Sequence, residues 1–432
     1  MTFDVYTAML LKQRLCRLLP VGHAFAQYKT ILQVSPYDVL VHKRAGFLAE
    51  GQPSEYASFR EIEPSGVEFE IEPPQHLGPG SLLPIKSKTR AFYVASLDNA
   101  ELRARSSVIV VGDTAFLDME SPEADMIDDQ FELDPAIFAR DTEGGVLYIE
   151  NGRDVVEFEE AFVSLVGLHA PAFGHWLWEY LPKLLSAISA DALPAMRVLV
   201  DADQPKAHFD ALRMVLPPGF EMTPVPAGAT IRLERAWCAP SLMYMPLLEI
   251  TNDRWHRNYP RYLATLPQRF DGVLTMLRGA STASRAETAL RRRVYLARGD
   301  RLHRKLVNSE EIEAIARRRE FEVVYPEQRE FSEQVQLIRE ARFIVGPEGS
   351  AFSLCAFAEP GTKVCILNHT HAEGLVALSG IWCQAGLDVT IVTGRIVRAN
   401  DEPGYPNFGG THFADYEIDP VLFTDFLETW LC

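Results

Sequence analysis

Two hydrophobic patterns divide the chain near residue 140. Before it, short apolar runs such as 91–94 and 107–111 alternate with turns rich in proline, glycine and charged residues. This is typical of β-strands joined by loops. From about residue 145, short apolar runs alternate with segments whose apolar residues recur at helical spacing. Such alternation favours a parallel sheet covered by helices. The sequence therefore predicts a β-rich N-terminal region followed by α/β structure.

The α/β part contains two cycles of strands and helices, separated by the small, polar segment 279–290. The first cycle has predicted strands at 145–149, 162–166 and 197–200 and helices at 176–188 and 206–215. The second has strands at 293–297, 321–324, 342–345, 363–367 and 388–392 and helices at 309–319, 332–339 and 419–430. We therefore predict three regions. Residues 1–140 form a β-rich region of unassigned role, 141–285 a first α/β domain and 286–432 a second one.

Composition places the chain among ordinary soluble globular proteins, with 47% hydrophobic and 23% charged residues in 432. The formal net charge of -17 argues against a nonspecific nucleic-acid binder or a binder of anionic membranes. No apolar stretch approaches about 18 residues, so no membrane-spanning helix is expected, and the N-terminus does not read as a signal peptide. Six scattered cysteines without a CxxC pair favour a reducing compartment. We predict a cytoplasmic protein.

One segment has the order of strand, glycine turn and helix. The β-branched run 342–345 breaks at Gly346 and Pro347, and Glu348, Gly349 and Ser350 precede an apolar, helix-compatible run. Ligands bind at the carboxyl ends of parallel strands, and helix N-termini attract phosphate oxygens. Gly349 and Ser350 let a ligand approach the backbone. The alternative is an ordinary strand-to-helix turn.

A basic segment follows the predicted strand 293–297 and includes Arg298, Arg304 and Lys305. Arginine forms forked hydrogen bonds to phosphate oxygens, and lysine acts as a compact charge. The alternative is a solvated basic loop. Because both this segment and the glycine turn follow strands of one predicted sheet, they are expected on the same edge. Together they could hold the phosphates of a nucleotide without a metal.

His175 and Glu179 lie four residues apart, which places both on one face of a predicted helix close to its N-terminus. Such a pair suits a general base and its orienting partner. The alternative is a histidine packed among aromatic residues, with Glu179 as a surface partner. Pro182 predicts a kink or break in this helix.

Other chemical motifs are missing from the sequence. It has no Walker A loop, HExxH or GxSxG motif, and the absence of a GxGxxG fingerprint disfavours a nicotinamide-dependent oxidoreductase. His369 and His371 lack an evident set of further metal ligands, so we predict no metal site.

Several of these elements, in the same order, resemble glycosyltransferase family 61 over roughly residues 150–420. The similar segments are 174–184 (His-Trp-x-x-Glu-x-Leu-Pro-Arg-Leu in the family), 295–298 with 304–311 (Tyr-Ile-Ser-Arg…Arg-x-Ile-x-Asn-Glu), 331–335 (Ser-Phe-x-Glu-Gln), 345–351 (Gly-Pro-His-Gly-Ala-Gly-Leu) and 412–416 (His-x-Asp-Phe). The chain departs from the family at Glu348, where histidine is common, and at residues 350–352, which replace Ala-Gly-Leu.

The resemblance implies a GT-B-like fold, with two Rossmann-like parallel-sheet domains facing a cleft and a β-rich N-terminal extension outside the match. It also implies inverting transfer from a nucleotide sugar, typically a UDP-sugar, without a metal or other cofactor. By position it implies that His175 and Glu179 face the acceptor. Glu348 is a second candidate base, or an acceptor of a sugar or ribose hydroxyl. The implied donor-binding residues are Arg298, Arg304, Lys305, Gly346, Gly349, Ser350 and Ala351.

We therefore predict an inverting, metal-independent glycosyltransferase acting on a glycan or polysaccharide acceptor. The alternative is a non-catalytic glycan- or nucleotide-binding protein on the same scaffold, because an acid at Glu348 would repel a diphosphate. Neither prediction includes a nucleic acid as partner. The donor sugar, the acceptor and the oligomeric state are left open, with a homodimer among the options.

Overall fold

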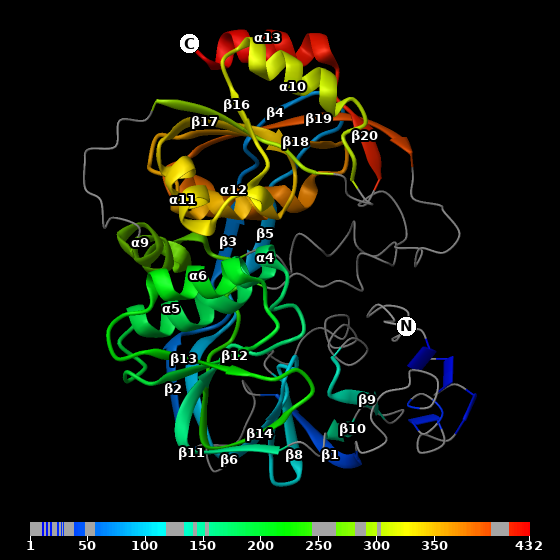
Figure 1. The fold of residues 1–432 in the computed structure, drawn as a ribbon, viewed down its shortest axis with the longest axis vertical. Coiled ribbons are helices and arrows are strands. Elements are labelled where there is room, and N and C mark those ends of the chain that lie inside the picture. Colours follow the sequence, from blue (N-terminus) through cyan, green and yellow to red (C-terminus); the bar gives the residue numbers. More distant parts are fainter. Residues whose placement is uncertain are drawn as a thin grey trace. The chain divides into compact units, whose positions relative to one another are not determined.

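The computed structural model is a mixed α/β protein with parallel sheet regions and a β-rich N-terminal part, as predicted (Figure 1). It describes residues 39–47, 57–117, 134–140, 145–151, 155–243, 265–280, 291–299, 304–398 and 414–432, with single residues between 11 and 29. The chain forms two compact units. Unit 1 comprises Met1–Gly66, Arg90–Pro205 and Leu216–Leu242, and unit 2 comprises Val67–Thr89, Lys206–Val215 and Met243–Cys432. These units cross the domain limits that we expected near residues 140 and 285. Of the expected linker 279–290, residues 279 and 280 are the last two of the helix α9 (Asp271–Ala280), and residues 281–290 lie outside the described residues.

Unit 1 is built on one sheet, with eleven strands in the described part of the chain. β11 (Val155–Ser164) pairs in parallel with β12 (Arg197–Asp201) and β14 (Thr230–Cys238), and β12 with β13 (Glu221–Val225). β14 also pairs antiparallel with β6 (Phe92–Arg103). The remaining strands are β1 (Val39–Phe47), β2 (Ser58–Glu63), β7 (Ile109–Val111), β8 (Thr114–Leu117), β9 (Ile137–Arg140) and β10 (Val146–Asn151). Because β6 joins the two kinds of strand, the β-rich region and the first α/β region share one sheet.

The helix that follows β11 is divided into three pieces. They are α4 (Phe173–His175), the π-helical turn η3 (Trp176–Tyr180) and α5 (Leu181–Ser189). The Leu181 N–H donates to the Trp176 carbonyl, which is the wider hydrogen-bond spacing of a π-helix. Pro182, which lacks an N–H, lies at the start of α5, directly after the π-helical turn, and the backbone stays helical from η3 into α5, so the chain does not break at this proline. Single π-turns of this kind are frequent at functional sites.

Unit 2 contains a seven-stranded sheet in its described residues. Its strands are β16 (Glu322–Val324), β15 (Arg292–Leu296), β17 (Ala341–Pro347), β18 (Lys363–His369) and β19 (Asp388–Arg398), all parallel and in this order. β20 (Asp415–Glu417) and β4 (Gln75–Leu77) both pair with β19. α10 (Ser309–Arg318) and α13 (Pro420–Trp430) cover one face, and α11 (Phe331–Arg339) and α12 (Glu373–Gln384) lie on the other (Figure 1). Short 3-10 helices follow β16 (η5, Pro326–Gln328) and β17 (η6, Ser350–Phe357).

Residues 67–89 belong to unit 2 although they lie within the N-terminal region of the sequence. β4 pairs in parallel with β19, and β3 (Glu68–Ile71) pairs with β5 (Ile85–Lys88) beside it. The Thr393 hydroxyl donates to the Pro79 carbonyl at 2.6 Å, and His76 Nε2 lies 2.8 Å from the same hydroxyl. This part of the N-terminal region therefore supplies a strand to the edge of the unit 2 sheet.

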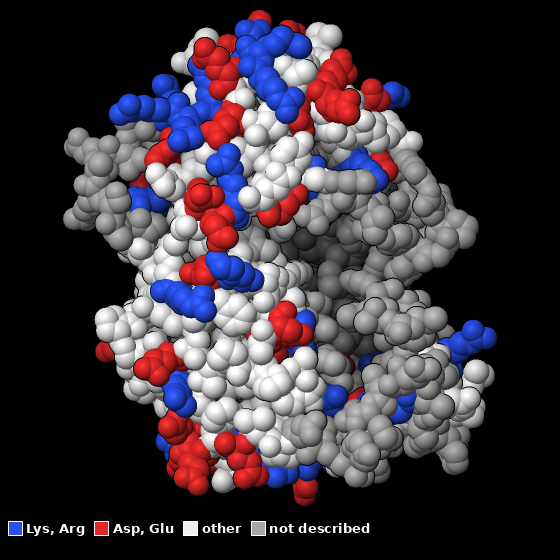
Figure 2. Space-filling view, in the orientation of Figure 1, with Lys and Arg blue, Asp and Glu red and all other residues white. Residues whose placement is uncertain are grey.

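Acidic and basic side chains are interspersed over the described surface in Figure 2. Many of them pair, as Arg292 does with Glu322 and Glu340, both at 2.7 Å. Among the described residues, no helix combines the length and apolar composition needed to cross a bilayer.

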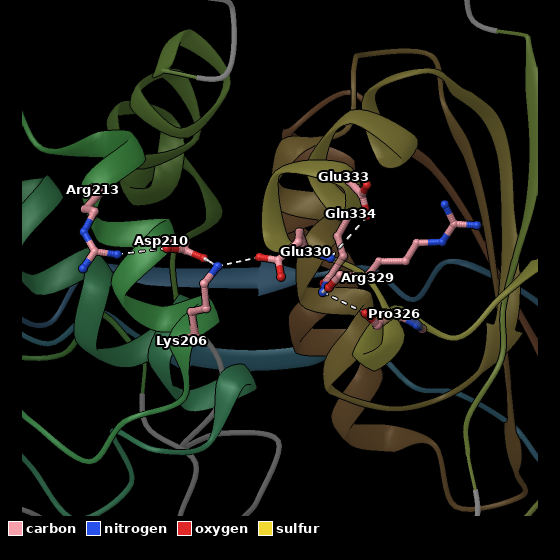
Figure 3. Close-up of polar contacts among 8 residues, drawn as sticks. All are labelled: Lys206, Asp210, Arg213, Pro326, Arg329, Glu330, Glu333 and Gln334. Atoms are coloured by element: carbon pink, nitrogen blue, oxygen red, sulfur yellow. Dashed lines mark hydrogen bonds and ion pairs between the residues drawn. The ribbon is translucent and has the colours of Figure 1, made fainter.

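α6 (Lys206–Val215) has the predicted bounds, but it packs within unit 2 beside α11 and α9 (Asp271–Ala280), which follows the 3-10 turn η4 (Pro267–Phe270). Figure 3 shows Lys206 Nζ between Asp210, at 2.8 Å, and Glu330, at 2.5 Å. Glu330 is the N-cap of α11 and forms a capping box with Glu333. The helix that connects β12 to β13 therefore belongs to unit 2, although both strands belong to unit 1.

Candidate functional site

The strand order of unit 2 reverses between β15 and β17, its first and third parallel strands. In open parallel sheets, ligand sites form at the carboxyl ends of the two strands that flank such a reversal, because their outgoing connections diverge there. Tyr295 pairs with Val345 across this boundary. Arg298 follows β15 and Glu348 follows β17. The structure thus brings the two predicted donor-binding segments together at one point of the sheet edge.

Glu348 is held by both arginines that were predicted to bind phosphate. Arg298 Nη1 donates to the Glu348 main-chain carbonyl at 2.6 Å, and Arg304 Nη1 forms an ion pair with the Glu348 carboxylate. The side chains of Arg304 and Glu348 are 21% and 18% exposed, so this pair is only partly screened by water. The Glu348 N–H donates to the Leu367 carbonyl at 2.8 Å. The acid at this position is therefore neutralised by its own neighbour and ties the two loops together.

The segment that carries Arg304 and Lys305 is fixed through its backbone by β20. The Lys305 N–H donates to Asp415 Oδ1 at 2.8 Å, and the Tyr416 N–H donates to the Lys305 carbonyl at 2.9 Å. The Lys305 residue is exposed. Arg304 has a left-handed backbone with φ of 53°, which a non-glycine residue adopts at some energetic cost. The rest of the predicted basic segment, residues 300–303, lies outside the described residues.

Tyr416 lies beneath the turn and was missed as a site residue, although it closes the family-like segment 412–416. Its buried hydroxyl donates to the Leu367 carbonyl at 2.9 Å, the same oxygen that accepts from the Glu348 N–H. Burial raises the pKa of the Tyr416 phenol, and the nearby Arg298 opposes this rise. The phenol therefore stays neutral and donates a hydrogen bond that supports the turn.

The turn itself differs from the prediction in two ways. β17 continues through Gly346 and Pro347, which pair with Ile366 and Leu367 of β18, so the turn begins at Glu348. The following helix, η6, is a 3-10 helix, and Phe352–Phe357 within it are all buried, so packing on every side accompanies the tighter pitch. Ser350 is exposed and Ala351 partly buried at its start.

Two glycines make the close approach of β15 and β17 possible. A Cβ on Gly346 would lie 2.2 Å from the Leu296 carbonyl oxygen, and a Cβ on Gly349 would lie 3.3 Å from Cδ and Nε of Arg298. Gly346 is buried within its strand. Gly346 lets the backbones of β15 and β17 meet, whereas Gly349 leaves room beside Arg298.

We expect Gly346→Ala to destabilise unit 2, because the new methyl group meets backbone and not a movable side chain. Overpacking of this kind costs about 1–3 kcal/mol and occasionally more. The matched control is Gly279→Ala in α9, where nothing lies within 4 Å of the new Cβ and helix propensity favours alanine. Urea denaturation of both variants measures the effect. Equal free energies of unfolding in the two variants would contradict the close backbone contact at Gly346.

The second predicted pair lies in unit 1. His175 Nδ1 lies 3.0 Å from Glu179 Oε2, and the side chains are 12% and 3% exposed. Glu179 is therefore not the surface partner that the alternative reading required. Because the carboxylate accepts the Nδ1 proton, the neutral imidazole presents Nε2 as its unprotonated nitrogen. The pair has the chemistry of a general base held by an orienting acid.

Residues 173–365 match the family described as Glycosyltransferase 61. The match spans His175 and Glu179 in unit 1 and Arg298, Arg304 and Glu348 in unit 2. Residues 173–365 form a glycosyltransferase family 61 domain. The match confirms the resemblance for the similar segments between residues 174 and 351, and it supports a glycosyltransferase; the similar segment 412–416 lies outside it. A search of the curated proteins finds no match to this chain.

The two remaining histidine candidates of this transferase are His369, which is buried, and His371, which is partly buried. His369 is buried, packs edge-on against Tyr416 with ring centroids 6.0 Å apart, and its Nδ1 accepts the His371 N–H at 3.1 Å. No group of three or more metal-ligating side chains is found within the described part of the chain. Metal independence stays a prediction.

Asp201 at the carboxyl end of β12 is a buried acid that sequence reasoning missed. It accepts hydrogen bonds from the Gly167 N–H at 3.1 Å and the Arg105 N–H at 2.7 Å. Burial raises the pKa of Asp201 from 3.8 to about 6, and these two N–H groups limit the rise. Through Gly167 it fixes the loop that leads from β11 to α4 and hence to His175.

We expect the contribution of Asp201 to stability to fall as pH rises from about 4 to about 6. The folded state holds the Asp201 proton more tightly than the unfolded state, so this contribution is greatest below pH 4, falls through this window and is constant above it. A difference of about two pH units corresponds to about 3 kcal/mol. Denaturation at several pH values, compared with Asp201→Asn, isolates this contribution. The prediction is wrong if the difference between wild type and variant does not change with pH.

Proposed function

We propose that this transferase moves a sugar from a nucleotide sugar, of the UDP-sugar class, to a hydroxyl group of a glycan or polysaccharide acceptor, with inversion and without a metal. The observation that carries the proposal is the meeting of Arg298, Arg304 and the Glu348–Ser350 turn at the strand-order reversal of unit 2. The family match and the chemistry of the His175–Glu179 pair support it.

In this proposal the diphosphate lies over the turn. The guanidinium group of Arg298 offers a fork that fits two phosphate oxygens, and Lys305 adds a compact charge. Gly349 and Ser350 lie at the start of η6, where the first N–H groups of a helix have no intrahelical partner and can donate to an anion. Since Arg304 pairs with Glu348, the acid of the turn does not lie unpaired beside the diphosphate.

Acceptor activation is assigned to His175. Its Nε2 takes the proton of the acceptor hydroxyl, and the oxygen attacks the anomeric carbon. As the new carbon–oxygen bond forms, the bond to the phosphate breaks and its electron pair leaves with the nucleoside diphosphate. Glu179 stabilises the resulting imidazolium. One displacement inverts the anomeric centre, and a GT-B-like arrangement of the donor and acceptor sites is part of the proposal.

Glu348 is the less suitable base of the two candidates. Its carboxylate forms an ion pair with Arg304, so the arginine occupies the group that would have to contact the acceptor hydroxyl. Its backbone is also fixed at both the N–H and the carbonyl. We therefore assign Glu348 to the organisation of the two arginines.

A donor panel tests the proposal. Purified protein is incubated with UDP-glucose, UDP-galactose, UDP-N-acetylglucosamine, UDP-xylose and their GDP, dTDP and CMP counterparts, and both the unfolding midpoint and the release of nucleotide are followed. We expect at least one UDP-sugar to raise the midpoint, because a ligand that binds the folded state alone stabilises it, and to be hydrolysed slowly. Stabilisation by another nucleotide class would contradict the UDP assignment, and neither effect with any donor would contradict the proposal itself.

A further inference from the structure

A second histidine packs against the proposed base. The rings of His169 and His175 have centroids 4.7 Å apart with an interplanar angle of 33°. His169 lies in the loop between β11 and α4, outside the segment that matches the family. The sequence gives no indication of this contact, because the five residues between the two histidines cross from an irregular loop into α4.

The loop is built to hold His169 in this place. The His169 N–H donates to the Tyr180 hydroxyl at 3.1 Å. Tyr180 also occupies the space beside Gly167, where a Cβ would lie 2.4 Å from the tyrosine ring and hydroxyl. Tyr180 is the last residue of the π-helical turn η3. The same turn therefore carries Glu179, which binds one edge of His175, and Tyr180, which places His169 against its face.

An imidazole at position 169 stabilises the fold less than an apolar ring of similar size would. Its Nε2 is buried and has no hydrogen-bond partner among the described residues. A buried polar atom without a partner destabilises a fold, and a phenyl ring would avoid this cost. Burial lowers the pKa of His169 well below 6.5, and the neighbouring His175 lowers it further, so the ring stays neutral. The charged groups nearby are Glu179, on Nδ1 of His175, and Lys183, over the Tyr180 ring at 5.0 Å.

We infer that His169 is a positioning residue of the transfer reaction, whose neutral imidazole fixes the His175 ring and stabilises the positive charge that this ring acquires from the acceptor proton. This inference rests on the proposed function, in which His175 is the base. An aromatic face stabilises a nearby cation, and a phenyl ring would keep that part of the effect. The ring nitrogens add a dipole that a phenyl group lacks.

The test is His169→Phe, measured on the hydrolysis of UDP-glucose or of the UDP-sugar that stabilises the protein most in the donor panel. Removal of the unpartnered nitrogen should raise the unfolding midpoint by about 2–4 °C. At the same time kcat should fall at least about tenfold, with the dissociation constant for UDP unchanged. Should His169→Phe not fold, His169→Gln is expected to show the same fall in kcat. A kcat within twofold of wild type in the folded variant would overturn the inference.

A double variant separates this inference from the proposed function. In a His175→Ala background, His169→Phe should cause no further loss, because residues that act as a unit are not additive. If the losses in turnover of the two single variants multiply in the double variant, the inference is wrong. If His175→Ala alone retains normal turnover, the base assignment of the proposed function fails. If His175→Ala is impaired but His169→Phe is not, the inference about His169 fails alone.

Discussion

Arg298→Ala is expected to weaken binding of the donor about 10- to 150-fold, because it removes hydrogen bonds between charged groups that are worth about 1.5–3 kcal/mol. Turnover should fall by about a further 100-fold, since the same guanidinium stabilises the charge on the departing diphosphate. The variant also loses the bond from Arg298 to the Glu348 carbonyl. Calorimetric titration with UDP and hydrolysis rates with the preferred UDP-sugar measure the two effects.

Two further variants make this result specific. Arg298→Lys keeps the charge and loses the fork, so we expect intermediate binding. Arg342→Ala removes an exposed arginine near the start of β17, at the end of the strand opposite to the turn, and should bind UDP normally. Unchanged UDP binding and turnover in Arg298→Ala would contradict the proposal that Arg298 binds the donor phosphates.

His175→Ala should lower turnover by about 100- to 10,000-fold, the usual contribution of a general base, while UDP binding stays normal. Glu179→Gln should have a smaller effect in the same direction, because the amide still reaches Nδ1 but no longer stabilises the imidazolium. Glu157→Gln is the control, since Glu157 is exposed on β11 of the same unit and pairs with Arg232 at 3.1 Å. Rates of UDP-sugar hydrolysis over a range of pH check all three. Near-normal turnover in His175→Ala would require a different base.

Local patterns in the sequence were sufficient for the elements that carry the candidate site. The β-branched run at 342–345 identified β17, the periodic segment 206–215 identified α6 with its observed bounds, and the i,i+4 spacing of His175 and Glu179 anticipated their contact. In each case the determining interactions lie within a few residues of one another. The family motifs then indicated which elements belong to one enzyme.

Long-range packing decided what the sequence could not indicate. α6 joins unit 2 because of contacts with α11 and α9, far away along the chain. α12 was not predicted, because its apolar residues surround the helix and give little amphipathic periodicity. β4 has three residues and no apolar alternation, so only its pairing with β19 reveals it. His169, Asp201 and Tyr416 acquire their roles from neighbours that no spacing rule connects.

The 3-10 pitch of η6 and the extension of β17 through Pro347 have the same origin. Gly346 and Pro347 are strong turn signals in isolation. Here they pair with β18, and the turn is displaced by two residues to Glu348. Consequently Glu348, the residue at which the chain departs from its family, is the first residue of the turn and contacts both arginines.

The most direct test of the central claim is hydrogen exchange of the backbone amides with and without UDP, because it locates the bound nucleotide on the chain. The account predicts slower exchange at residues 297–299 and at Gly349 and Ser350 when UDP is present, with loss of this protection in Arg298→Ala. Protection confined to residues of unit 1, or unchanged protection in Arg298→Ala, would contradict a donor site at the β15–β17 reversal.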